Sequence, residues 1–134
     1  LAFILETAAY DLCDLNEMAF RIGAPCQRQL LDIFLDVDKE AEEGHSMEAS
    51  WRGVRKAQIK LATFYLTEGA TDLARTIFED MKDEMPSRLA SIRTEFNNIK
   101  TRDFWEINDR GINFDYLEAE QRSALETFFG WFKA

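Results

Sequence analysis

Apolar residues recur every three or four positions through almost the whole chain, and few residues interrupt that rhythm. The 134 residues include six glycines and two prolines, too few for the frequent tight turns of a β-sandwich or barrel. Steps of three and four positions are the period of one face of an α-helix. The sequence therefore predicts an all-α fold.

Glycines and prolines divide this rhythm into segments. Gly23 and Pro25 separate the first segment from the second, Gly69 ends the third, and Pro86 closes the fourth. In the first segment the predicted inward face consists of Phe3, Ile4, Ala8, Leu12, Leu15, Ala19 and Ile22. Six helices are expected, over residues 2–22, 25–37, 47 or 51 to 67, 70–85, 87 to a bend near 102–106, and 117–132.

Consecutive helices joined by short turns are expected to pair as three antiparallel hairpins. The polar stretch 39–50 predicts the longest loop, 108–111 a turn, and 112–116 an extended segment packed on the core. A chain of this length fits one domain, 1–134. Because it opens at Leu1 without a methionine, we expect it to be excised from a longer protein.

The net charge of −9 is unevenly distributed. Residues 1–48 carry eleven acids and three bases, 49–100 seven acids and nine bases, and 101–134 seven acids and four bases. Binding to nucleic acid or to an anionic membrane needs dense positive charge, so neither is expected. No apolar run approaches the roughly 20 residues that span a bilayer, so membrane insertion is not expected either.

The side chains that usually carry chemistry are few. His45 is the only histidine, which excludes a two-histidine metal site. Cys13 and Cys26 have no CxxC spacing, so they are interpreted as reduced, buried and inert thiols of a cytoplasmic protein. No glycine-rich phosphate loop or nucleophile elbow is present. We therefore expect no enzyme activity, cofactor or bound metal.

One stretch, residues 56–86, carries a positional pattern of small, aromatic and turn residues. Its agreeing residues are Leu61, Ala62, Tyr65, Gly69, Ala74, Phe78 and Pro86. In that register the stretch resembles a tetratricopeptide repeat, a helix-turn-helix unit of 34 residues. Gln58 and Met81 depart from the pattern, which covers about a quarter of the chain. The fold is thus expected to be either a tetratricopeptide-like stack or an irregular helical bundle.

The resemblance implies a binding groove lined by the first helix of the repeat. Beside the basic position Arg52, its lining residues would be Lys56, Ile59, Lys60, Thr63 and Leu66. Two lysines on this face would suit an acidic peptide. The alternative is that the basic residues are solvated or pair within the chain with the acidic first third.

The end of the chain is rich in aromatic residues. Phe128 and Phe132 share a helix face, while Trp131 falls to its side. An exposed Trp131 would offer an anchor for a partner or for a second copy of the chain.

These features favour a protein-interaction or scaffolding module with a helical groove for a peptide or partner helix. A structural, regulatory or oligomerisation domain of a larger protein is the first alternative. A small-molecule or metal sensor, or an enzyme using acidic residues, is the second.

Overall fold

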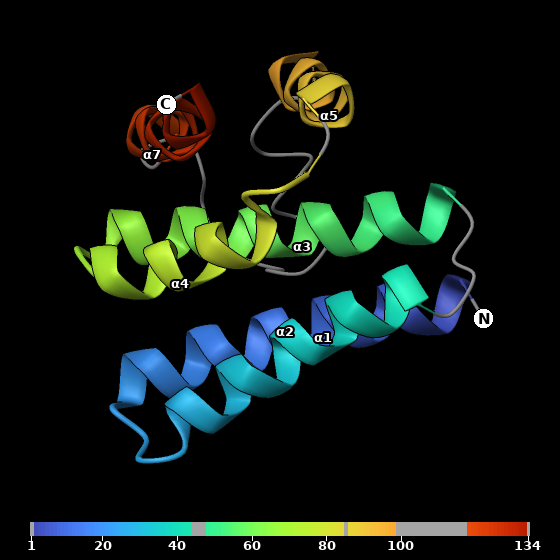
Figure 1. Ribbon diagram of the computed structural model, residues 1–134. Coiled ribbons are helices and arrows are strands. Elements are labelled where there is room, and N and C mark those ends of the chain that lie inside the picture. The colour runs from blue at the N-terminus through green and yellow to red at the C-terminus, as the bar shows by residue number, and fades with distance from the viewer. Residues whose placement is uncertain (1, 44–47, 85, 99–117, 134) are drawn as a thin grey trace. The chain divides into compact units, whose positions relative to one another are not determined.

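The computed structural model describes residues 2–43, 48–84, 86–98 and 118–133 (Figure 1). This part of the chain contains no strand, which confirms the predicted all-α class. Its six α-helices also match the predicted number. They are α1 (Ala2–Ile22), α2 (Gln27–Glu43), α3 (Glu48–Thr67), α4 (Thr71–Met81), α5 (Pro86–Asn98) and α7 (Glu118–Gly130), and a short 3-10 helix, η1 (Trp131–Lys133), follows.

The predicted loop over 39–50 was too long. Helix α2 continues to Glu43 and α3 begins at Glu48, because the glutamate and alanine residues of this stretch are good helix formers even where no apolar period marks them. His45, the predicted turn at 108–111 and the predicted extended segment at 112–116 lie outside the described residues.

The chain divides into two compact units, residues 1–61 and 62–134. The expectation of a single domain stays a prediction. Helix α3 runs through the boundary, so that its first fourteen residues belong to unit 1 and its last six to unit 2.

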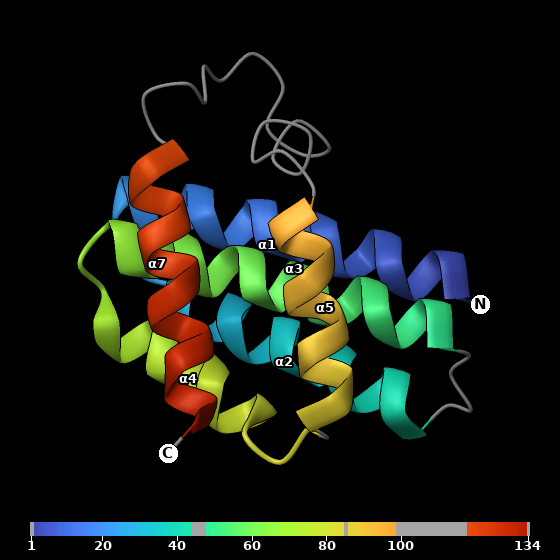
Figure 2. The ribbon, with the colours of Figure 1, turned by 90° about the horizontal axis from the view of Figure 1, so that it is seen from above.

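In unit 1, α1 and α2 form an antiparallel hairpin (Figures 1 and 2). The Asn16 side-chain amide donates to the backbone carbonyls of Leu12 at 2.8 Å and of Leu30 at 3.1 Å, which ties α1 to α2. Helix α2 buries one apolar face composed of Leu31, Phe34 and Val37.

In unit 2, α5 and α7 lie side by side and antiparallel (Figures 1 and 2). The Phe96 and Phe129 ring centroids are 6.3 Å apart, and Arg93 pairs with Glu126 across the same contact at 2.5 Å. The short helix η1 contacts α4 through Phe78, whose ring centroid is 4.8 Å from that of Phe132.

Among the described helices, none combines the length and the apolar character needed to cross a lipid bilayer.

Glycine ends two of the helices as predicted. Gly69 follows α3 with φ +78°, its N–H donates to the Leu66 carbonyl at 3.2 Å, and the Ala70 N–H donates to the Tyr65 carbonyl at 2.8 Å. Gly23 after α1 has φ +67° and the same pair of bonds. This is the Schellman arrangement, in which a left-handed residue lets the last carbonyls of the helix find donors.

We expect Gly69→Ala to lower the free energy of unfolding by about 1–2 kcal/mol, because a side chain in the left-handed region strains the backbone. A Cβ at position 69 meets nothing within 4 Å, so the cost is conformational rather than steric. Gly130→Ala is the matched control, since Gly130 ends a helix without a positive φ and also has open space. Urea unfolding should show a lower free energy of unfolding for Gly69→Ala and an unchanged or higher one for Gly130→Ala.

Candidate functional site

Helix α1 buries two polar side chains and leaves three large apolar side chains exposed. Asn16 and Glu17 are buried, whereas Leu15, Met18 and Ile22 are 46%, 59% and 72% exposed. The last three are spaced i, i+3 and i+7, so they form one stripe along the helix, called here the α1 stripe. Periodicity had predicted Leu15 and Ile22 on the inward face, and that prediction was wrong.

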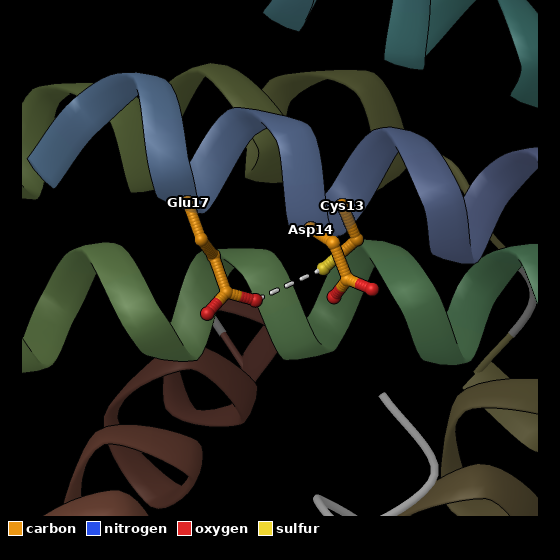
Figure 3. Close-up of side chains that lie close together, drawn as sticks. All are labelled: Cys13, Asp14 and Glu17. Atoms are coloured by element: carbon orange, nitrogen blue, oxygen red, sulfur yellow. Dashed lines mark hydrogen bonds between the residues drawn. The ribbon is translucent and has the colours of Figure 1, made fainter. Parts of the chain in front are cut away.

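The inward face of α1 is built around a lysine from α3. Lys60 Nζ lies 2.6 Å from Glu17 Oε2 and 3.9 Å from Asp14 Oδ1. The Lys60 side chain is fully buried and that of Glu17 is 5% exposed. Figure 3 shows Cys13, Asp14 and Glu17 projecting together from α1. These three residues and Lys60 are called the Lys60 cluster.

A buried ion pair of this kind constrains the helices that carry it. Removing an ammonium and a carboxylate from water costs several kcal/mol for each, and only close contact with good hydrogen bonds compensates that cost. Lys60 and Glu17 are 43 positions apart in the sequence. Their pairing therefore fixes how α1 is rotated about its axis relative to the unit 1 part of α3.

The Cys13 thiol is fully buried in the same cluster. Its Sγ donates to Glu17 Oε2 at 3.4 Å (Figure 3) and accepts from Lys60 Nζ at 3.9 Å. Burial is the main cause that raises the pKa of Cys13 well above its ordinary value; the nearby ammonium of Lys60 lowers it, and Glu17 raises it further. The thiol therefore stays protonated, which suits a hydrogen-bond donor and not a nucleophile.

The donor atoms of Cys13, Asp14 and Glu17 lie within 4.8 Å of one another, close enough to hold a metal ion. The ammonium of Lys60 already lies among them as their cation. A metal would have to displace a buried positive charge from its best partner. The geometry thus favours an internal ion pair over a metal centre.

The structure gives Lys60 a different role from the predicted one. It had been expected to face a peptide, and the alternative, pairing with the acidic first third of the chain, is confirmed for this residue. Ile59 and Thr63 are also buried, so none of these three side chains lines an open surface in the described structure.

The other predicted groove residues are more accessible. Lys56 is half-buried, and the side chain of Arg52 lies outside the described residues. Leu66 is half-buried too, and lines a hollow of about 480 Å³ in unit 2 with Thr67 and residues of α7. The predicted set is therefore not presented together on one surface.

Gln58, a departure from the repeat pattern, is fully buried. Its side-chain carbonyl accepts from the Arg55 guanidinium at 2.9 Å, and Arg55 is buried beside it. An aromatic residue at this position would remove that hydrogen bond to Arg55.

Trp131, the predicted anchor, is half-buried in an aromatic cluster of unit 2. The Arg75 guanidinium lies 4.0 Å from its ring centroid, within the range of a cation–π contact. The Phe78 and Phe128 rings lie 5.7 Å and 5.8 Å away. Trp131 thus joins η1 to α4 within the unit.

The two cysteines are not bonded to each other. Cys13 is buried as predicted, but Cys26 is exposed, because it lies in the turn before α2 and not on a packed helix face.

No protein-family model matches this sequence, and neither a curated protein nor a solved structure matches it. The interpretation of the site therefore depends on its own geometry.

We expect Lys60→Met to destabilise the chain by about 3–5 kcal/mol, because the buried Glu17 carboxylate loses the cation at 2.6 Å and keeps the more distant Arg21 guanidinium, 4.0 Å away. Replacing both partners, as in Lys60→Met/Glu17→Leu, should restore most of that loss, since an apolar pair of similar size has no charge to desolvate. Urea unfolding of the two single variants and the double variant measures the coupling.

Lys82→Met is the control for the loss of a lysine. Its ammonium pairs with Glu79 at 2.9 Å, but both side chains are more than half exposed, so we expect little change. If the double variant loses as much unfolding free energy as the Lys60 and Glu17 single variants together, the result contradicts a buried, coupled pair.

The two thiols should differ sharply in reactivity. At pH 8, Ellman's reagent should modify Cys26 rapidly and leave Cys13 untouched, because Cys13 is buried and its raised pKa keeps the thiolate scarce. A Cys26→Ser variant should react only after denaturant is added. Fast reaction of that variant in native buffer would show that Cys13 is accessible.

Proposed function

We propose that this chain is a non-catalytic protein-interaction module that docks a helix of a partner protein against the α1 stripe. The observation that supports this is the exposure of Leu15, Met18 and Ile22 at i, i+3 and i+7. This spacing is how an α-helix presents anchors to another helix or to a groove. Single exposed apolar residues are ordinary, but an aligned row of three is not.

The Lys60 cluster supports the same proposal. Rolling α1 to bury the stripe would carry Glu17 away from Lys60 and leave a buried ammonium without its partner. The stripe is therefore held outward by the interior of unit 1. An apolar face that the fold itself keeps exposed is suited to a partner.

The energy available from the stripe is moderate. Complete burial of one leucine, methionine or isoleucine side chain contributes about 1.5–3 kcal/mol, and these three are already partly covered, so about 1 kcal/mol each remains. A partner held by such a row alone would bind weakly, and polar contacts around the stripe would have to add affinity and specificity.

The resemblance to a tetratricopeptide repeat belongs to this proposal. Its support is a helix–turn–helix through α3 and α4, with Gly69 in the turn and with Ala62 and Ala74 fully buried. We place the docking surface on α1 and not on α3, since Ile59, Lys60 and Thr63 are buried. Two free cysteines suit a cytoplasmic protein, which is part of the same proposal.

A photoreactive phenylalanine analogue placed at the position of Met18 tests the docking surface in cells. The control carries the analogue at Ile33, which is 50% exposed on α2. We expect a discrete product with one protein from position 18 and none from position 33. The product should then be identified and its protein purified.

Binding of that purified protein completes the test. The variant Leu15→Gln/Met18→Gln/Ile22→Gln should keep its helical circular dichroism, because exposed positions tolerate polar residues, and should lose at least tenfold in affinity. Equal binding by this variant and by the native chain would overturn the proposal.

A further inference from the structure

We infer that the helix docked on the α1 stripe is basic, with a lysine or arginine facing Asp11. This inference rests on the proposed function and specifies its partner. The position of Asp11 and the negative charge of the α1–α2 hairpin support a basic partner, and the same charge disfavours a second copy of the chain or an anionic lipid surface.

Asp11 lies on the line of the stripe. It precedes Leu15 by four residues and Met18 by seven, and at 100° per residue all three project from the same side of α1. Asp11 is exposed. Read as a heptad seam, Leu15 and Ile22 hold equivalent positions, and Asp11 holds the position equivalent to Met18.

A single charged residue in an apolar seam selects partner and register. Covering Asp11 with an apolar side chain would desolvate a carboxylate without compensation, and a facing carboxylate would repel it. A facing lysine or arginine retains the apolar contacts on Leu15 and Met18 and pairs the charge. The α1 stripe therefore favours a partner helix that places a cation opposite Asp11.

The net charge of the α1–α2 hairpin also favours a basic partner. Helix α1 carries four acids and one base, and α2 carries six acids and two bases, so that their net charge is −7. Glu17 and Lys60 are buried against each other and cancel, so that the other charged residues of the hairpin sum to −6. A basic helix would be attracted to the hairpin by its net negative charge.

The same charge disfavours the other occupants of an apolar stripe. A second copy would bring two hairpins of net charge −7 together, with Asp11 in both seams. An anionic lipid surface would be repelled as well. Met18 suits a helical partner, since methionine is flexible and adapts to differently shaped side chains.

Two synthetic peptides of about three heptads test the inference. Both peptides carry leucines along one helix face. One peptide has lysine, and the other has glutamate, at a single position on that face and at the positions beside the face. Binding of each labelled peptide to the full chain is followed by fluorescence anisotropy. We expect the lysine peptide to bind at least about tenfold more tightly than the glutamate peptide, and raised salt to weaken it.

Charge reversal at one position provides the specific readout. Asp11→Lys should reduce the preference for the lysine peptide by about tenfold, because a favourable charge pair becomes a repulsive one. Asp32→Lys is the matched control: it makes the same charge change at an exposed α2 position that pairs with Arg28 at 3.4 Å. That variant should change the preference by about twofold or less.

The outcomes separate the inference from the proposed function. Equal binding of both peptides, abolished by Leu15→Gln/Met18→Gln/Ile22→Gln, would leave the docking surface in place and overturn the basic partner. Concentration-dependent dimerisation lost in that variant would make a second copy the occupant and overturn it too. Binding of neither peptide would overturn the inference, and together with no cross-link from position 18 it would overturn both.

Discussion

The buried ion pair between Lys60 and Glu17 determines how unit 1 is arranged. Each charge would be costly to bury alone, so the two helices that carry them hold the rotation that keeps the atoms 2.6 Å apart. Asn16, one residue before Glu17, adds a hydrogen bond to the backbone of α2. The inward face of α1 thus makes polar contacts with two helices, and Leu15, Met18 and Ile22 are left outside.

Local structure was predictable because its causes are local. The helices follow from apolar spacing and helix propensity, and their ends follow from Gly23 and Gly69, which adopt the left-handed conformation that few other residues tolerate. Where the period fades, as in the acidic end of α2, a loop was predicted and the helix in fact continues to Glu43. The residues at this end of α2 have high helix propensity although they lack an apolar period, and helix propensity is the signal that predicts the longer helix.

The candidate site was not predictable from such signals. Apolar periodicity assumes that the hydrophobic face of a helix is its buried face, and α1 breaks that assumption at Leu15 and Ile22. The reason is a contact between positions 17 and 60, and nothing near either residue reveals the other. The charge imbalance of the first third did raise the alternative that basic residues of this helix pair with it, and for Lys60 that alternative is confirmed.

Where Lys60 lies also changes which partner the charges favour. With Lys56 and Lys60 on a surface, the chain would present cations to an acidic peptide. With Lys60 buried against Glu17, one base and one acid are withdrawn together from the surface of unit 1, and the other charged residues of the α1–α2 hairpin sum to −6. The exterior of the hairpin is acidic by composition, and Asp11 lies on the line of the apolar stripe that the ion pair holds outward. One contact thus directs the α1 stripe outward and removes Lys60 from the surface on which an acidic peptide would have met it.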